Sequence, residues 1–191
     1  MNIQKLEGNW IDGWALDVHT RSSVRMPDGT FCNDRTDLGE QLYRLKYQGD
    51  RSMIGLIVDK AFEFLEQSGC TWLLDAVVPI PSSDPNRTFQ PLLDLATELG
   101  RRLGIPAPRD YLVSAVRRPP IKNVMGRQDR RKQIAGTMKV TDARFAGKWV
   151  LLFDDIFDSG VTANEAAWVL RDQGRVEEIH LLTITKTRTG G

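Results

Sequence analysis

The sequence predicts an α/β fold with a mostly parallel central sheet flanked by helices. Short apolar segments alternate with longer segments in which apolar residues recur every three or four positions. This alternation is typical of parallel strands joined by crossover helices. Apolar runs such as VLLF favour strands that are buried on both faces. The length of 191 residues fits one domain, or one domain with a small addition.

The first 35 residues differ from the rest of the chain, and we expect them to form a small β-rich region. The segments WALDVH and SSVRM alternate in part between apolar and polar residues, and PDGT is a turn signal. We therefore predict two units, a β-rich region at residues 1–35 and an α/β domain at residues 36–191.

Helices are predicted where apolar side chains align on one face. This pattern covers residues 36–47, 51–67, 91–103 and 162–173. Gly69 and Gly174 follow two of these segments and are typical helix stops. Thr162 and Glu165 have the T-x-x-E spacing of a capping box, which predicts the start of the last helix.

Four short apolar segments are predicted to be strands. They are AVVPIP, YLVSAV, WVLLF and IHLLTIT. In parallel sheets of this kind, ligands bind beyond the carboxyl ends of the strands. The residues that follow WVLLF are therefore the first candidates for a functional site.

The composition argues against several classes of protein. The net charge of +1 creates no overall field that would attract nucleic acid or an anionic membrane. No apolar stretch is long enough to span a bilayer, and the N-terminus lacks a signal-peptide pattern, so we expect a cytoplasmic protein without membrane contact. Cys32 and Cys70 stand alone in the sequence, which disfavours a zinc site or a disulfide framework.

A loop suited to a phosphate precedes the last predicted helix. It consists of Asp158, Ser159, Gly160, Val161 and Thr162. The first turn of a helix offers N–H groups and the positive end of the helix dipole to an anion. The two hydroxyl side chains add hydrogen-bond donors, and the glycine permits close approach of a ligand.

Two adjacent carboxylates, Asp154 and Asp155, come just before this loop, at the end of the predicted strand. Ionised carboxylates only accept hydrogen bonds, so the pair can hold two vicinal hydroxyl groups or, through water, Mg²⁺. Together with a phosphate loop, this chemistry matches ribose 5-phosphate.

The segment VLLFDDIFDSGVT resembles the 5-phosphoribosyl-1-diphosphate (PRPP) binding motif of the type I phosphoribosyltransferases. That motif is an apolar strand, two acidic residues, two spacers, and then Asp, Ser or Thr, Gly, any residue and Thr, and this sequence matches every defined position. The segments LKYQGDR, VVPIPSS and RRKQIAGTMKV are similar to the competence protein F (ComF) branch. The similarity to this branch runs from about residue 42 to the C-terminus.

The resemblance implies the type I phosphoribosyltransferase fold and a glycosyltransferase reaction. PRPP and Mg²⁺ would be used to transfer a 5-phosphoribosyl group to an unidentified nitrogenous small molecule, with release of diphosphate. Asp154 and Asp155 would hold the ribose hydroxyls, stabilise the positive charge that develops on the ribose, and contact Mg²⁺ indirectly, through water or PRPP. Residues 158–162 would bind the 5-phosphate.

Pro81, Ser82 and Ser83 match the position of the diphosphate loop in the same family, and a proline-terminated strand is the alternative interpretation. The basic segment 117–132 is either solvated surface or a mobile loop that closes over the diphosphate. On the second interpretation, Arg117 and Lys122 are catalytic candidates. The further candidates for PRPP binding in this segment are Arg130 and Arg131. Nucleic acid is disfavoured as a partner, because no aromatic side chain interleaves with these charges.

The acceptor cannot be identified from the sequence. The resemblance makes residues 1–35 a candidate hood over the acceptor, in which Trp10, Trp14 and Phe31 would stack on a base, although core packing is the favoured role for these aromatics. We expect Asp158 to shape the loop, and the alternative is a role as acid or base toward the acceptor.

Two other functions are alternatives to a transferase. A receiver domain also places paired aspartates at a strand end, but only one helix and one strand follow the pair here, which disfavours it. A non-catalytic regulator that binds PRPP or a nucleotide, or a protein associated with DNA uptake, is the stronger alternative. A homodimer is a further candidate partner state for this chain.

Overall fold

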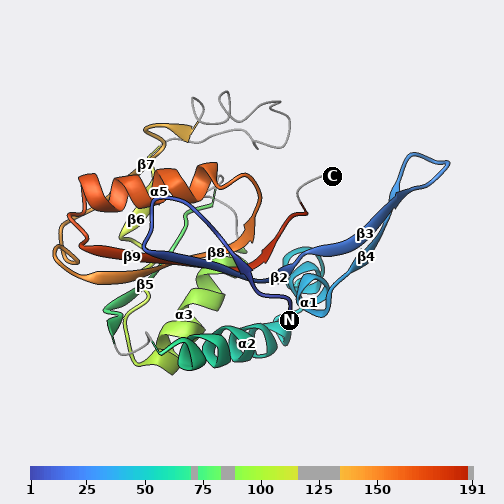
Figure 1. Ribbon diagram of the computed structural model, residues 1–191, viewed down its shortest axis with the longest axis horizontal. Helices are drawn as coiled ribbons and strands as arrows, with labels where there is room; N and C mark the ends of the chain where they lie inside the picture. The colour runs from blue at the N-terminus through green and yellow to red at the C-terminus, as the bar shows by residue number, and fades with distance from the viewer. Residues whose placement is uncertain (70–72, 83–88, 116–133, 189–191) are drawn as a thin grey trace.

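The structure is a computed structural model that describes residues 1–69, 73–82, 89–115 and 134–188. Its centre is a five-stranded sheet with the strand order β1-β2-β9-β8-β5 (Figure 1). The strands are β1 (Gln4–Lys5), β2 (Asp12–Val18), β5 (Ala76–Pro79), β8 (Trp149–Phe157) and β9 (Glu178–Lys186). β1 is antiparallel to β2 and all other neighbours are parallel, which confirms the predicted mostly parallel sheet.

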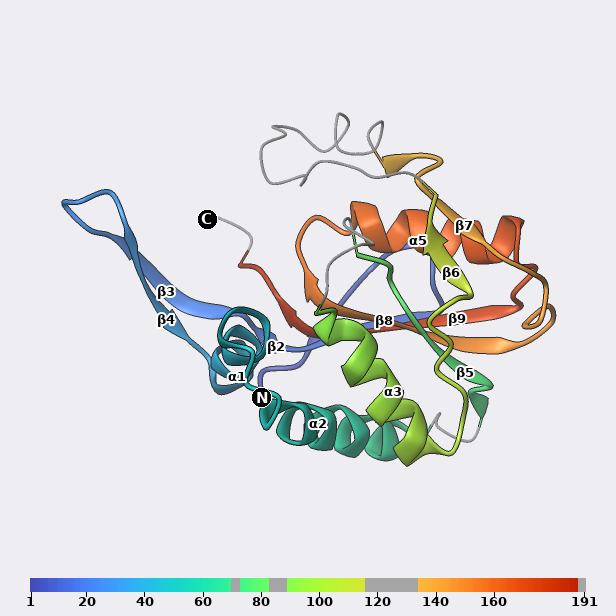
Figure 2. The same ribbon diagram turned by 180° about the vertical axis from the view of Figure 1, so that it is seen from behind.

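Helices cover both faces of the sheet, as predicted. Helix α5 (Val161–Asp172) lies on one face, whereas α2 (Met53–Ser68) and α3 (Pro91–Leu103) lie on the other (Figures 1 and 2). A short helix α1 (Asp37–Tyr43) runs directly into a π-helical turn, η1 (Arg44–Gln48). The four predicted helices therefore exist, with ends that differ by a few residues and with a change of helix type inside the first.

The central strands separate two hydrophobic cores. In β8, Val150 and Leu152 belong to the core under α5, whereas Leu151 and Phe153 belong to the core under α2 and α3. All four side chains are fully buried. Because successive strand residues point to opposite faces, an uninterrupted apolar run is required wherever both faces are covered. This explains why the WVLLF segment shows no polar alternation.

The predicted strand YLVSAV does not belong to the central sheet. Its observed part, β6 (Leu112–Ser114), pairs in antiparallel orientation with β7 (Met138–Val140) and forms a separate two-stranded sheet. Leu112 and Met138 are buried in the core under α5. The expectation of a further parallel strand is therefore wrong, because these apolar residues are covered by the helix layer and not by the sheet.

The N-terminal 35 residues are β-rich but are shared between two parts of the structure. β1 and β2 are strands of the central sheet, whereas β3 (Thr20–Arg25) and β4 (Phe31–Arg35) form a hairpin that projects from the body of the molecule (Figures 1 and 2). The predicted PDGT turn connects β3 to β4, where the backbone N–H of Met26 donates to the carbonyl of Thr30 at 2.8 Å.

The three aromatic residues of this region have different environments. Trp10 is 7% exposed and belongs to the core under α5, and Trp14 packs against the other core, so the predicted core role is confirmed for both. Phe31 is 62% exposed and lies at the start of β4, where it packs into neither core. In the part of the chain that the structure describes, no helix combines the length and apolar character that crossing a bilayer requires.

Gly39 and Gly55 occupy the third position of α1 and α2 but have different surroundings. A Cβ atom at Gly39 would overlap the carbonyl oxygen of His19, whereas at Gly55 the nearest atom is 4.0 Å away. We expect Gly39→Ala to lower the free energy of unfolding by about 1–3 kcal/mol, because backbone must move to admit the methyl group. Gly55→Ala should raise the free energy of unfolding by about 0.5 kcal/mol through helix propensity.

Urea denaturation of the two variants measures this difference. Effects of the same sign and size would contradict the close approach of α1 to the turn between β2 and β3.

Candidate functional site

The predicted acidic pair lies where β8 loses one of its two neighbours. β5 ends at Pro79, opposite Phe153, whereas β9 stays paired with β8 as far as Phe157. Asp154 and Asp155 are thus residues of β8 itself and do not follow a strand end as predicted. The strand is longer than its apolar segment because β9 continues the ladder of backbone hydrogen bonds. The step between β5 and β8 leaves room for a cavity beside the pair.

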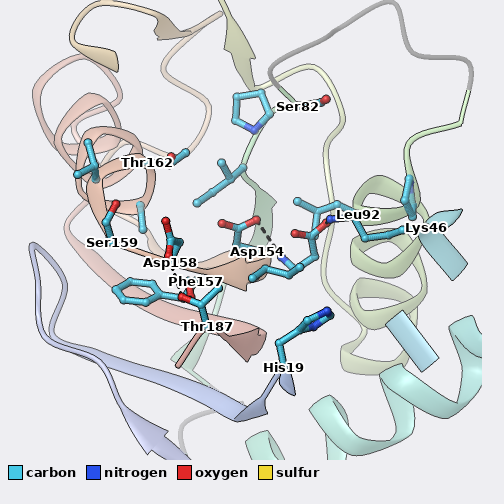
Figure 3. A pocket seen from close by; sticks show the side chains of 18 of the residues that line it. His19, Lys46, Ser82, Leu92, Asp154, Phe157, Asp158, Ser159, Thr162 and Thr187 are labelled. Carbon is cyan, nitrogen blue, oxygen red and sulfur yellow. Dashed lines mark hydrogen bonds and ion pairs between the residues drawn. The ribbon is translucent and has the colours of Figure 1, made fainter. Parts of the chain in front are cut away.

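A cavity of about 770 Å³ opens at this step (Figure 3). Its walls include predicted site residues from three segments of the chain. They are Pro81, Ser82, Asp154, Asp155, Asp158, Ser159, Gly160, Val161 and Thr162. The volume lies within the range of small-molecule sites. The remaining predicted site residues lie outside the described residues, and they are Ser83, Arg117, Lys122, Arg130 and Arg131.

The loop at residues 158–162 forms a tight entry into α5. Gly160 is the N-cap of the helix and has a left-handed backbone with φ of 75°. A Cβ atom there would lie 2.7 Å from the ring of Phe157. The side-chain nitrogen of Asn164 donates to the carbonyl of Gly160 at 2.8 Å, which fixes the loop to the first turn. The N-terminus of a twelve-residue helix therefore faces the cavity, as a phosphate site requires.

The predicted capping box is wrong. Thr162 makes no capping hydrogen bond, because the chain enters the helix through Gly160 and the threonine already lies inside the first turn. Glu165 instead accepts a hydrogen bond from the backbone N–H of Gly136 at 2.8 Å. Thr162 lines the cavity and does not cap the helix.

Asp158 is tied to the segment that follows β9. Its carboxylate accepts a hydrogen bond from the hydroxyl of Thr187 at 2.8 Å, and the backbone N–H of Thr187 donates to the carbonyl of Phe157. These contacts connect the loop to the end of the neighbouring strand. They agree with a role in loop shape, and the alternative role toward an acceptor stays a prediction.

Lys46 is a residue of the cavity that sequence reasoning missed. Its ammonium nitrogen lies 2.8 Å from a carboxylate oxygen of Asp155, and the two side chains are 16% and 18% exposed. Burial alone would lower the pKa of Lys46, but the charge and hydrogen bond of Asp155 and the charge of Asp154 outweigh burial and raise this pKa. Lys46 is therefore a cation held within the site.

A signal for Lys46 was present in the sequence. Leu38, Leu42 and Lys46 follow one another at intervals of four, so a helical pattern places the lysine on the apolar stripe. Both leucines are buried in the core under α2 and α3. A charged residue on such a stripe requires a partner, and the structure identifies that partner as Asp155.

His19 lines the same cavity from the turn between β2 and β3. Its Nδ1 atom lies 3.1 Å from the hydroxyl of Thr185. Burial is the main reason why the pKa of His19 is lowered, and the charges of Arg35 and Lys46 act in the same direction. Asp155 and Glu40 oppose the shift without reversing it. The imidazole is therefore biased toward its neutral form.

The carboxylate pair fits Mg²⁺ only in part. Among the residues that the structure describes, no cluster of three or more His, Cys, Asp or Glu side chains could hold a metal ion. Mg²⁺ binds through oxygen ligands, and it is often held by one or two carboxylates together with substrate phosphates and water. Asp154 and Asp155 supply the carboxylates, and a phosphate-bearing substrate would have to supply further ligands.

The comparisons with known proteins concern the fold. No protein-family model and no curated protein matches the sequence. The chain is similar to adenine phosphoribosyltransferase from Saccharomyces cerevisiae, solved with D-2,5-dideoxy-2,5-imino-altritol 1,6-bisphosphate and adenine, at a TM-score of 0.51 and 14% identity over 86% of this chain and 83% of that one. It also matches adenine phosphoribosyltransferase from Thermoanaerobacter pseudethanolicus, at a TM-score of 0.44 and 15% identity over 86% and 94% of the two chains. The similarity to the yeast enzyme confirms the predicted phosphoribosyltransferase fold.

Gly160 and Gly147 provide a matched pair for testing the loop. Both have positive φ, of 75° and 68°, but only Gly160 faces a side chain at the position of a Cβ atom. We expect Gly147→Ala to lower the free energy of unfolding by about 1–2 kcal/mol through backbone strain alone. Gly160→Ala should cost about 1–2 kcal/mol more, because its methyl group meets Phe157. Equal losses in chemical denaturation would show that the contact with Phe157 is not part of the fold.

The lowered pKa of His19 predicts how stability depends on pH. Below the ordinary value of 6.5, the unfolded chain binds a proton that the folded protein resists, so the free energy of unfolding should fall as the pH falls toward the lowered pKa. The variant His19→Gln removes this contribution and should show a shallower loss of stability over that range. Well above pH 6.5 the two proteins should have parallel profiles. Denaturation at a series of pH values measures both slopes, and identical slopes below 6.5 would refute the assignment to His19.

Proposed function

We propose that this protein is a phosphoribosyltransferase that uses PRPP and Mg²⁺ to transfer a 5-phosphoribosyl group to a nitrogenous small molecule and releases diphosphate. The main support is the presence of two kinds of binding group in one cavity. A helix N-terminus with hydroxyl side chains lies beside two adjacent carboxylates. The helix N-terminus suits an anionic group, whereas the carboxylates suit hydroxyl groups. The fold supports the coarser assignment to a glycosyltransferase-type enzyme.

Each end of a ribose 5-phosphate has a partner in the proposed complex. The N–H groups at the start of α5, with Ser159 and Thr162, would bind the 5-phosphate. Asp154 and Asp155 would accept hydrogen bonds from the 2- and 3-hydroxyls of the ribose. Binding at both ends would fix the furanose ring over β8, which is the positioning that a displacement at C1 requires.

The reaction would break the bond between C1 and the diphosphate oxygen, and the leaving group would keep the electron pair. Positive charge would develop on the ribose, and the nearby carboxylates would stabilise it. A nitrogen lone pair of the acceptor would form the new bond to C1, and the acceptor would release its proton to solvent. Mg²⁺, when bound, would neutralise charge on the diphosphate.

Several finer assignments belong to the same proposal. Pro81 and Ser82 line the cavity and, with Ser83, would face the diphosphate. The ComF-like branch, the cytoplasmic location, the homodimer and the part played by the basic segment 117–132 stay predictions. The acceptor would enter near residues 1–35, of which His19 lines the cavity.

Calorimetry with PRPP and Mg²⁺ followed by a screen of acceptors, scored by diphosphate release, tests the function. We expect the double variant Asp154→Asn, Asp155→Asn to stay folded and to lose PRPP-dependent turnover by at least about 100-fold, because stabilisation of the developing charge is lost. The matched control is the double variant Asp59→Asn, Asp110→Asn, whose two carboxylates are exposed and lie outside the cavity. It should retain wild-type turnover.

The outcomes separate the two main candidates. If PRPP binds but no base, ammonia or amine gives diphosphate release, the protein is a non-catalytic regulator that binds PRPP and is not an enzyme. If wild-type protein binds neither PRPP nor ribose 5-phosphate, both candidates are rejected.

A further inference from the structure

We propose that Lys46 is a further substrate-binding residue, which pairs with Asp155 in this structure and contacts the C1 diphosphate when PRPP is bound. The inference rests on the proposed function and adds a residue and an exchange of partners to it. In this exchange, the ribose hydroxyls donate hydrogen bonds to Asp155, and the ammonium group of Lys46 moves from the carboxylate to the diphosphate. No covalent bond is made or broken in this step.

Contacts other than the ion pair between Lys46 and Asp155 also anchor the π-helical turn. η1 is a five-residue segment that continues α1, and its Leu45 side chain is fully buried. On one side of the turn, the guanidinium of Arg35 lies 3.7 Å from the ring centre of Tyr43. On the other side, Arg44 forms an ion pair with Asp50. π-helical turns are rare and occur frequently at functional sites.

The position of Lys46 relative to the phosphate loop suits the far end of PRPP. Ser159 and Thr162 lie on one side of the cavity, Lys46 lies on the opposite side, and Asp154 lies between them (Figure 3). In a ribose ring, the 5-phosphate and the C1 substituent extend in opposite directions. A ligand with its phosphate in the loop and its hydroxyls on the carboxylates would therefore direct its diphosphate toward Lys46.

The charge balance of the cavity supports the same role. Among the described residues that line the cavity, Lys46 is the only lysine or arginine. Two adjacent carboxylates repel each other unless a cation lies close, and Lys46 supplies that cation to Asp155. Leaving either charge of a buried pair without a partner is costly. PRPP offers hydroxyls to the carboxylate and an anion to the ammonium group, so both charges keep a partner after the exchange.

Calorimetry with two ligands tests the proposal, because ribose 5-phosphate lacks the diphosphate that Lys46 would contact. In the presence of Mg²⁺, we expect Lys46→Met to weaken PRPP binding by about 10-fold or more and ribose 5-phosphate binding by less than about 3-fold, since only one ligand loses a charge-assisted contact. Lys148→Met is the matched control. Lys148 also pairs with an aspartate, Asp75 at 3.1 Å, but lies outside the cavity. This variant should bind both ligands as wild-type protein does.

Equal losses of affinity for the two ligands, or no loss of affinity for PRPP, would overturn the proposal. The role of Lys46 would then be limited to neutralising Asp155. Those results require that wild-type protein binds ribose 5-phosphate, so they are distinct from a failure of the proposed function, in which wild-type protein binds neither ligand.

A second comparison covers the case in which Lys46→Met does not fold. The double variant Lys46→Met, Asp155→Asn removes the carboxylate of Asp155 together with the cation that pairs with it. This protein is compared with Asp155→Asn alone. We expect the preferential loss of PRPP affinity to persist between these two proteins. Its disappearance would show that Lys46 acts only through Asp155, which would refute a contact with the diphosphate.

Discussion

The unequal lengths of neighbouring strands are the constraint on which the site depends. β8 and β9 run together to Phe157 and Lys186, whereas β5 stops opposite Phe153. Up to that point both faces of β8 are sealed by helices, and beyond it the strand carries carboxylates. A sheet with β5 continued would cover the space in which the cavity lies. The cavity is therefore a product of strand pairing and does not require a separate domain.

Electrostatic compensation then determines which groups can occupy this space. A pair of adjacent aspartates in a partly buried strand needs a nearby cation, and the chain supplies it from η1, which lies far away in sequence. The positive end of α5 adds a second favourable field on the other side. Anionic ligands with hydroxyl groups suit this arrangement, because they interact with both fields and leave the carboxylates hydrogen-bonded.

Local patterns in the sequence predicted the fold class, the helices and the glycine turn that leads into α5, because each depends on neighbouring residues. The apolar run before Asp154 and the glycine at position 160 are examples. Features that depend on distant contacts were missed or mistaken. Lys46 gains its role from Asp155. Glu165 accepts a hydrogen bond from the distant Gly136, and the segment around Leu112 pairs with a strand outside the central sheet.

The π-helical turn has a consequence for how this chain tolerates changes in length. A π-turn closes with one residue more than an α-turn, and one residue corresponds to a rotation of about 100° around a helix axis. An added residue between Leu42 and Lys46 would turn the lysine by about 100° relative to the buried leucine and direct its ammonium group away from Asp155. The contact between Lys46 and Asp155 thus depends on the number of residues along this turn as well as on their types.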